Sequence, residues 1–354
     1  MDPKVSILWI NYNSSSFINL ALESLYAIKN LDYPNYELII VDNASTDDSL
    51  EIISKFVKSH QIKSKIIRLE KNAGYTGGNN AAYRARDPDS KYIVLLNNDA
   101  VPKRDSLRKL VKIMENDESL GAVQGIILNY DEETIDTAGD YLSELFNTLS
   151  RGQGGRIQPK REVYATSPDG AYSICRVEAI KKAMGSDRRI FDDFIFACFD
   201  DHILGLRLWN SGFKVKVVSL ITAKHKRGSS FKKVTLLQFY LGVRNYITLN
   251  EMSNSRYKNL LRIFFVKQLF VYFLSRIFRI FGLKTQPDCK EAAAVFLRAF
   301  IDGIRIGRMK RKRKDTVDMY KAPIVRIEPL IAFLGVMTRP RLIDAYVRKQ
   351  LDKI

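Results

Sequence analysis

Three places in this sequence collect residue types that carry chemistry, and the first is the segment KYIVLLNNDAVP, residues 91–102. An apolar run at 92–96 stops there at Asn97, Asn98 and Asp99. Small acceptor side chains at the carboxyl end of a buried parallel strand lie where open α/β sheets bind ligands. Such oxygen atoms suit a divalent cation that keeps waters and shares phosphate oxygens with a substrate. The same residues are also common in β-turns, so the residue types leave both interpretations open.

The second place is the segment FDDFIFACFDDHILGLRLWNSGFKV, residues 191–215, which holds two pairs of adjacent aspartates. Asp200 and Asp201 come directly before an expected helix, where the helix dipole favours carboxylates, so they suit either a structural cap or acid–base chemistry. Repulsion between these neighbours would raise one of the two pKa values. Asp192 and Asp193 are a competing pair, ranked lower because no helix start follows them at once.

The third place is the segment AKHKRGSS, residues 223–230, which contains one of only three histidines in the chain. A lone histidine is usually structural or on the surface, but Lys226 and Arg227 beside His225 would suit a diphosphate. His202 directly follows Asp201, and we expect it to have at most an indirect role.

The expected secondary structure brings polar residues to one edge of a sheet. Four apolar runs predict strands, at residues 5–10, 37–41, 65–69 and 92–96. Helical patterns or caps lie between them, and this alternation predicts an α/β fold with a doubly wound parallel sheet. A polar segment follows each strand, at residues 11–13, 42–43, 72–79 and 97–99. Right-handed crossovers put all four segments on the same edge, where we expect a wide polar crevice for a nucleotide.

Gly74, Gly77 and Gly78 lie in the third polar segment. They would let the backbone approach a ligand closely, although a tight turn is the more frequent reason for a glycine. Neither a P-loop nor a dinucleotide fingerprint occurs. Later in the chain, we expect strands at 121–128 and 213–218, a polar and mobile loop at 136–155, and a turn at 167–171.

Composition divides the chain into two parts. Residues 241–354 contain 24 Lys and Arg against 9 Asp and Glu, a net charge of +15, whereas the first 240 residues have a net charge of +3. This asymmetry predicts an anionic partner, either a membrane or a nucleic acid. The three cysteines have no metal-type spacing, which fits a reducing compartment. The apolar run near the N-terminus predicts a strand and not a signal peptide or an anchor.

The C-terminal part favours a membrane surface over nucleic acid. Residues 260–284 are aromatic, apolar and basic, and their longest apolar run is too short to span a membrane. The spacing predicts an interfacial amphipathic helix, and the alternative is a helix packed on the rest of the chain or on a second subunit. The basic run at 308–314 would bind anionic lipids, and no nucleic-acid-reading signature accompanies it. Residues 322–338 add an apolar patch with two prolines.

Four ordered motifs resemble the signature of inverting family 2 glycosyltransferases with the GT-A fold. They are VSILWINYN, VDNASTDDS, NAGYTGGNN and LLNNDAVP, and the resemblance covers residues 4–245. The most similar subgroup is the rhamnosyltransferase-like enzymes that build surface polysaccharides and glycoprotein glycans. The resemblance implies a GT-A, Rossmann-like catalytic domain at 1–240 and a helical, basic extension at 241–354 that associates with a membrane or dimerises.

The resemblance also implies roles for individual residues. Asp42 would contact the nucleotide base, Asp99 and His225 would hold Mg²⁺ or Mn²⁺ with the diphosphate, and Asp201 would be the general base. Asn97 and Ile203 depart from the aspartates that family members carry in these places. Donor binding would involve Asn11, Asn13, Asp42, Asn72, Gly74, Gly77, Gly78, Asn79, Asn97 and Asn98. Gly170, Ala171 and Asp200 would line the acceptor site.

These residues predict an inverting, metal-dependent transfer of a sugar from a nucleotide diphosphate to a glycan or lipid-linked acceptor. The protein would lie peripherally on the cytoplasmic face of the cell membrane, without nucleic acid as a partner. A homo-oligomer through the C-terminal region is a further expectation. Two other classes remain open: a catalytically silent partner that binds a nucleotide sugar, and a nucleic-acid-binding protein that uses the basic C-terminus.

Overall fold

The computed structural model describes residues 2–156, 161–228, 235–280, 289–337 and 340–351, without the side chains of 272–280, 289–291 and 340–342. The chain divides into two compact units. Unit 1 comprises Met1–Tyr141 and Ser150–Lys232, and unit 2 comprises Leu142–Leu149 and Lys233–Ile354. The predicted domain boundary at residue 240 falls inside helix α7 (Leu236–Met252).

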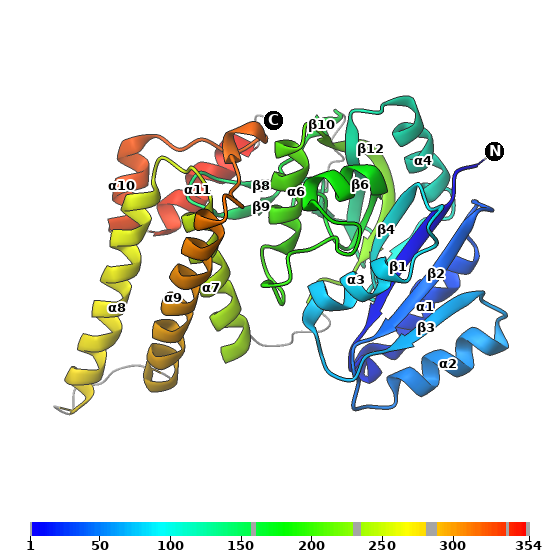
Figure 1. Cartoon of the computed structure of the whole chain (residues 1–354), viewed down its shortest axis with the longest axis horizontal. Coiled ribbons are helices and arrows are strands. Elements are labelled where there is room, and N and C mark those ends of the chain that lie inside the picture. Colours follow the sequence, from blue (N-terminus) through cyan, green and yellow to red (C-terminus); the bar gives the residue numbers. More distant parts are fainter. Residues whose placement is uncertain (1, 157–160, 229–234, 281–288, 338–339, 352–354) are drawn as a thin grey trace. The chain divides into compact units, whose positions relative to one another are not determined.

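Unit 1 is built on one mixed sheet of ten strands among the described residues, in the order β10-β12-β6-β11-β4-β1-β2-β3, with β5 paired to β12 and β7 to β6 (Figure 1). Its strands are β1 (Val5–Asn11), β2 (Tyr36–Asp42), β3 (Ser64–Arg68), β4 (Tyr92–Asn97), β5 (Ala100–Pro102), β6 (Leu120–Asn129), β7 (Ile135–Thr137), β10 (Val163–Tyr164), β11 (Tyr172–Arg176) and β12 (Lys214–His225). The short strands β8 (Asp140–Leu142) and β9 (Thr148–Ser150) pair with each other.

The four predicted strands β1 to β4 are parallel neighbours, and their ends meet as expected. Asn11 at the end of β1 is level with Asp42 at the end of β2, and Ile10 is level with Asn97 at the end of β4. β11 runs antiparallel between β4 and β6. The predicted GT-A-like α/β fold is therefore confirmed, with β11 antiparallel inside the sheet and with β5, β7 and β10 antiparallel to the strands they pair with.

Helices cover both faces of this sheet because successive strand residues point to opposite sides. The helices of unit 1 are α1 (Ile18–Lys29), α2 (Ser49–Ser59), α3 (Gly74–Arg84), α4 (Ser106–Asn116), α5 (Val177–Met184) and α6 (Asp200–Asn210). Ile7 and Trp9 of β1 belong to a buried cluster with side chains of α1, α2 and α4. Leu8, between them, belongs to the opposite cluster, with side chains of α3, α5 and α6. Continuous apolar runs are thus buried on both sides.

One local prediction was wrong, and two others had the right element with the wrong bounds. Most of the predicted mobile loop at 136–155 is buried or paired in β7, β8 and β9. The strand predicted at 213–218 continues as β12 to His225 and pairs with β6 along its length. Helix α3 begins at Gly74, inside the predicted loop, because Asn43 and Asn72 accept hydrogen bonds from the first backbone N–H groups at Ala73 and Gly74.

Unit 2 contains the helices α7, α8 (Lys258–Ile280), α9 (Cys289–Lys312), α10 (Pro329–Met337) and α11 (Pro340–Leu351). α9 packs closely on α7, since a Cβ on Gly303 would lie 2.7 Å from the Arg244 carbonyl oxygen. The segment Leu142–Leu149 belongs to this unit: Glu144, fully buried, accepts hydrogen bonds from Arg256, Tyr320 and the Ile327 backbone N–H. No helix in the described ranges is both long and apolar enough to cross a membrane.

Candidate active site

The ends of β1 and β2 form a closed polar cluster around Asp42. The fully buried carboxylate of Asp42 accepts hydrogen bonds from Asn11 Nδ2 at 2.9 Å and from Ser45 Oγ at 2.6 Å. Asn13 ties the two loops together, since its Oδ1 accepts from the Thr46 backbone N–H at 2.8 Å. Arg68 Nε on β3 lies 3.7 Å from Asp42. The predicted donor-binding residues Asn11, Asn13 and Asp42 are therefore together, with Asn11 and Asn13 shaping the loops.

The glycines at the start of α3 are tightly packed against protein atoms. Gly74 has a φ of +73°, and a Cβ there would collide with Phe196. A Cβ on Gly78 would lie 2.9 Å from Ile10. Asn72 Oδ1 accepts from the Gly74 N–H, and Asn79 Nδ2 donates to the Tyr75 carbonyl oxygen. Close packing and helix initiation thus account for these residue types, whether or not a donor also contacts them.

Asp99 and His225 are direct partners at the end of β4. His225 Nε2 lies 3.1 Å from Asp99 Oδ1, and both side chains are buried. Asn98 beside them is also buried, and the Asn97 backbone N–H donates to the Ala171 carbonyl oxygen. The predicted metal pair and the predicted acceptor segment therefore lie around the same strand end.

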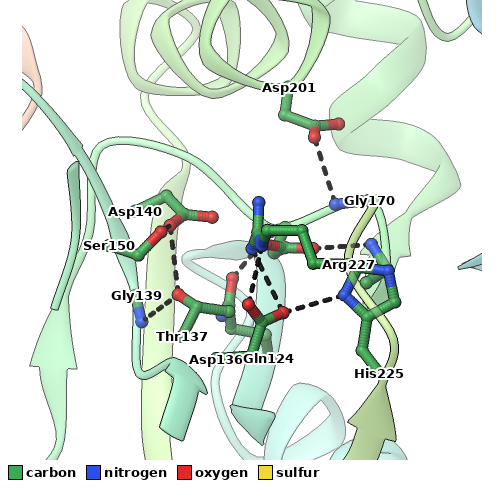
Figure 2. Close-up of polar contacts among 12 residues, drawn as sticks. Gln124, Asp136, Thr137, Gly139, Asp140, Ser150, Gly170, Asp201, His225 and Arg227 are labelled. Carbon is green, nitrogen blue, oxygen red and sulfur yellow. Dashed lines mark hydrogen bonds and ion pairs between the residues drawn. The ribbon is translucent and has the colours of Figure 1, made fainter. Parts of the chain in front are cut away.

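His225 has a second carboxylate partner that the sequence did not predict. Its Nδ1 lies 2.8 Å from Asp136 Oδ2. Burial alone would lower the pKa of His225, but the hydrogen bonds to Asp136 and Asp99, with their charges, outweigh it and raise the pKa to about 10. Figure 2 shows the imidazole of His225 with one ring nitrogen directed at the Asp136 carboxylate.

Arg227 connects this pair to the acceptor segment. Its Nε donates to Asp136 at 2.6 Å, and its terminal nitrogen donates to Asp136 at 3.2 Å and to Asp169 at 3.3 Å (Figure 2). Asp169 accepts from the Ala171 backbone N–H at 2.6 Å. The Arg227 guanidinium, which we expected to face a diphosphate, is thus engaged by two carboxylates in this structure.

Asp201 lies directly beside Gly170. The Gly170 N–H donates to Asp201 Oδ2 at 3.2 Å, and a Cβ on Gly170 would lie 3.0 and 3.1 Å from the two carboxylate oxygens and would collide with the Tyr75 hydroxyl. A side chain at residue 170 would therefore displace the Tyr75 hydroxyl and crowd the Asp201 carboxylate. Burial, followed by the charges of Asp200, Asp169 and Asp140, raises the pKa of Asp201 well above its usual range.

Buried polar atoms without a partner gather around Asp201. Within the described ranges, Asp201 Oδ1 and His202 Nε2 have no hydrogen-bond partner although neither atom touches solvent. Burial lowers the pKa of His202 to about 4, so the ring is neutral near pH 7. Burial also raises the pKa of Asp200, to about 6. Incomplete pairing of buried polar groups is expensive and is concentrated at functional sites.

The competing pair Asp192 and Asp193 has structural partners instead. Asp192 is buried and accepts two hydrogen bonds from Arg207, at 2.7 and 3.0 Å. Asp193 accepts from Asn80 at 3.3 Å and from Arg189 at 2.9 Å. Both carboxylates therefore stabilise the loop before α6, and the lower ranking of this pair agrees with these contacts.

One network of contacts joins most of the predicted chemistry. It runs from Asp99 through His225, Asp136, Arg227 and Asp169 to the segment that carries Gly170 and Ala171, and Gly170 in turn contacts Asp201 of α6. The members that sequence reasoning missed are Asp136, Asp140, Asp169 and Tyr75. Asp140, beside Ser150 and Thr137, has its pKa raised well above the usual range by burial and by Asp169. No local pattern marks these residues, because their partners are distant in sequence.

The donor set suits a cation that a nucleotide helps to hold. Asp99 offers carboxylate oxygens on the same side as His225 Nε2, which would bind a cation by giving up its proton. No cluster of three or more His, Cys, Asp or Glu side chains with metal-binding geometry occurs in the described part of the chain. Two protein ligands are what Mg²⁺ or Mn²⁺ needs when phosphate oxygens and waters complete the coordination. The residues present therefore fit such an ion.

The model of the family named "Glycosyl transferase family 2" matches residues 6–183 of the chain, the part that carries Asp42, Asp99 and the Gly170 segment. The chain belongs to this family. Asp201, His225 and Arg227 lie beyond the matched residues, so their roles depend on the geometry above.

Relatives of this glycosyl transferase family 2 chain come from several organisms. An uncharacterized glycosyltransferase of Nostoc sp. is 30% identical over 145 residues, which are 40% of this chain and 43% of that protein. A dolichyl N-acetyl-alpha-D-glucosaminyl phosphate 3-beta-D-2,3-diacetamido-2,3-dideoxy-beta-D-glucuronosyltransferase of Methanococcus voltae is 25% identical over 236 residues, 65% of this chain and 68% of that protein. The chain thus spans less than half the length of the Nostoc relative.

Solved structures show the same fold. The crystal structure of S. aureus TarS superposes with a TM-score of 0.53 at 17% identity, covering 99% of this chain and 55% of that one. The structure of TarS 1-349 in complex with UDP gives a TM-score of 0.50 at 18% identity and covers 91% of that chain. At this level of identity the likeness establishes the GT-A-like fold of this family 2 member.

Proposed function

We propose that this protein is an inverting, metal-dependent glycosyltransferase that moves a sugar from a nucleotide diphosphate to a hydroxyl acceptor. The observation that carries the proposal is the single network that joins Asp99 and His225 to the segment beside Asp201. The reaction needs a stabilised leaving group and a base. Asp99 and His225 would supply the first by binding a cation, and Asp201, whose carboxylate is incompletely hydrogen-bonded, would supply the second.

In this mechanism Asp201 takes the proton of the attacking hydroxyl. Its Oδ2 is oriented by the Gly170 N–H, and its Oδ1 has no partner in the described ranges. Because Oδ1 is covered in this structure, the acceptor would have to displace covering side chains before its O–H can donate to this oxygen. The raised pKa of Asp201 makes it a stronger base than an ordinary carboxylate once ionised. The attack is an in-line displacement at the anomeric carbon: the acceptor oxygen bonds to this carbon while the bond to the diphosphate oxygen breaks.

Residues at the other side of the strand ends would bind the donor. Asp42 would contact the base, and in this structure its buried carboxylate is held by Asn11 and Ser45. Asp99 and His225 would hold a Mg²⁺ or Mn²⁺ ion, which supplies Lewis-acid stabilisation of the charge that develops on the leaving diphosphate.

The sugar and the acceptor belong to the proposal only as classes. The Methanococcus voltae relative is named for transfer to a dolichyl-linked sugar phosphate. A Staphylococcus epidermidis protein that is 30% identical over 121 residues, 34% of this chain and 28% of that protein, is named as a poly-beta-1,6-N-acetyl-D-glucosamine synthase. Both names support a glycan or lipid-linked acceptor in cell-surface polysaccharide or glycoprotein glycan synthesis. The motif resemblance supports a hexosyl or rhamnosyl group, and the TarS complex makes UDP the first nucleotide to test.

A screen of nucleotide sugars tests this function. The purified full chain is incubated with each UDP-, GDP- and dTDP-sugar and Mn²⁺ or Mg²⁺, and release of the nucleotide diphosphate is measured with and without EDTA. We expect slow, metal-dependent release from one donor class even without acceptor. A silent nucleotide-sugar-binding module would raise its melting temperature with a donor, by mass action, without releasing any nucleotide.

We also propose that unit 2 binds the anionic cytoplasmic surface of a membrane peripherally. α8 exposes Ile263, Val266 and Phe270, and α10 exposes Leu330, Phe333 and Leu334. The last turns of α9 expose the basic side chains Arg305, Arg308 and Lys312. Exposed apolar side chains together with clustered cations suit a surface that offers both acyl chains and negative headgroups.

Vesicle cosedimentation tests this surface. The triple variant Arg305→Gln, Arg308→Gln, Lys312→Gln should bind vesicles containing phosphatidylserine roughly 100-fold more weakly, since each cation contributes about 1 kcal/mol. Neutral phosphatidylcholine vesicles are the control, and wild type should bind them weakly. Equal binding of wild type to both vesicles contradicts the proposal. A concentration-dependent dimer that binds no vesicle would assign the apolar faces to a second copy of the chain.

A further inference from the structure

Asp136 has no part in the reaction proposed above, yet it is almost completely buried among charged side chains. Its carboxylate is shared between two side chains: Oδ2 lies 2.8 Å from His225 Nδ1, and Oδ1 accepts from Arg227 Nε at 2.6 Å. A buried carboxylate costs free energy unless its oxygens are fully paired. The contacts of Asp136 explain how it is tolerated and point to what it does.

The backbone places Asp136 and His225 on rigid neighbours. Asp136 is the middle residue of β7, which pairs with β6 through Ile127 and Thr137. His225 is the last residue of β12. β12 also pairs with β6, and His225 is level with Asn129 of that strand. The two side chains therefore meet from strands that share one partner strand. Sites supported by paired strands are held more accurately than sites on loops.

Arg227 fixes the orientation of the Asp136 carboxylate. The guanidinium uses Nε and one terminal nitrogen to contact the two carboxylate oxygens, the planar arrangement that gives such pairs their geometric specificity. The same terminal nitrogen reaches Asp169 at 3.3 Å, so the guanidinium itself is held from two sides. With the carboxylate held in this way, Asp136 Oδ2 has a lone pair directed at the His225 ring.

We propose that Asp136 is the positioning residue of the predicted metal site, and that Arg227 holds it in place. Asp136 accepts the Nδ1 proton of His225, which selects the tautomer and the ring orientation in which Nε2 is presented to a divalent cation beside Asp99. Metal-binding histidines are oriented by carboxylates in this manner, and loss of such a carboxylate typically weakens metal binding about 10- to 100-fold. The inference rests on the proposed metal dependence.

The variant Asp136→Asn tests this role. An amide offers one acceptor oxygen to two donors, His225 and Arg227, so its NH₂ group must face one of them. Mn²⁺ binding to the full chain is measured from the free-ion signal in electron paramagnetic resonance, first with Mn²⁺ alone and then with pyrophosphate. We expect Asp136→Asn to raise the Mn²⁺ dissociation constant about 10- to 100-fold.

Asp192→Asn is a matched control, because Asp192 is equally buried and pairs with Arg207 through two hydrogen bonds, and it lies in the loop before α6 and not on the strands that carry Asp136 and His225. Both variants should lose stability to unfolding, and only Asp136→Asn should lose Mn²⁺ affinity. If both variants weaken Mn²⁺ binding to the same extent, the effect is general loosening of the fold and the proposal is overturned.

A double-mutant cycle with His225→Gln separates positioning from other effects of charge. If Asp136 acts through the imidazole, adding Asp136→Asn to His225→Gln should change the Mn²⁺ dissociation constant little further. A full additional loss in the double variant would show that Asp136 acts independently of His225. If wild type binds Mn²⁺ and Asp136→Asn binds it equally well, only this inference is overturned. Wild type that binds no Mn²⁺ overturns the proposed metal dependence and this inference with it.

Discussion

Buried carboxylates are used in opposite ways in the two units. In unit 2, Glu251 accepts hydrogen bonds from Arg262 at 2.7 Å on both oxygens. Burial alone would raise its pKa, but the Arg262 contacts outweigh it and lower the pKa. In unit 1, Asp201 has one backbone N–H donor and an oxygen without a partner in the described ranges. Burial and neighbouring aspartates raise its pKa well above the usual range.

The difference teaches how to tell a structural carboxylate from a candidate catalytic one. A fully paired carboxylate stabilises the fold in its ionised form, and nothing remains for a ligand to contact. An incompletely paired carboxylate among like charges costs stability, and such a cost is retained where the group has chemistry to perform. Asp192, paired to Arg207, shows that the distinction holds within unit 1 as well.

The largest expected effect is on transfer by Asp201→Asn. The amide cannot accept a proton from the acceptor hydroxyl, so kcat for sugar transfer should fall about 10²- to 10⁴-fold. Donor binding, followed by the thermal shift with the nucleotide sugar, should be unchanged because Asp42 and Asp99 are intact. Transfer at the wild-type rate would show that Asp201 is not the base. It would also show that incomplete hydrogen bonding does not mark the catalytic carboxylate in this protein.

A smaller effect is expected on stability from Asp200→Asn. Burial, reinforced by Asp169, raises the pKa of Asp200 to about 6 in the folded protein, above its usual value of 3.8. The folded state thus binds more protons than the unfolded state between these values, and wild-type stability falls as pH rises through this window. Without the ionisable group, the variant should gain on the order of 2 kcal/mol relative to wild type between pH 4 and pH 7.

Urea unfolding of both proteins at pH 4 and pH 7 measures this difference. A gain that is equal at the two pH values would come from packing and not from charge, and a relative loss at pH 7 would contradict the raised pKa.

The smallest expected effect is that of Glu251→Gln, and its pH dependence should have the opposite sign. The variant leaves Arg262 without its carboxylate and should lose about 1 kcal/mol at pH 7, since Arg262 keeps partial contact with water. Because the pKa of Glu251 is lowered in the folded state, its stabilisation is present above the usual value of 4.5 and is lost as pH falls below it. Unfolding curves of variant and wild type should therefore converge at acidic pH, with transfer by the folded variant unaffected.

Much of the sheet could be predicted because its central strands are apolar runs long enough to be recognised as strands from the sequence alone. β1, β2 and β4 begin and end within one residue of their predicted bounds. The short strands β7 to β9 could not be predicted, since three residues carry no periodicity and several of theirs are polar. The start of α3 was also missed, because glycine and asparagine are poor helix formers and the first turn is held by Asn43 from another loop.

The site was predictable to the same degree, and for the same reason. Asp42 and Asp99 directly follow readable strands, so their meeting at one sheet edge follows from topology. Asp136 and Asp169 acquire their importance from Arg227, which lies far along the chain. Pairing of that kind leaves no trace in composition or spacing.

The buried Glu144 of unit 2 limits how this chain can be shortened. The segment Leu142–Leu149 leaves the ribosome long before Arg256, Tyr320 and Ile327, the groups that neutralise and cover it. In a truncated protein that ends at residue 232, Glu144 would lose these hydrogen-bond partners. The aromatic ring of Phe146, now buried, would become exposed. A protein that ends there should therefore be poorly soluble unless the segment Leu142–Leu149 is redesigned.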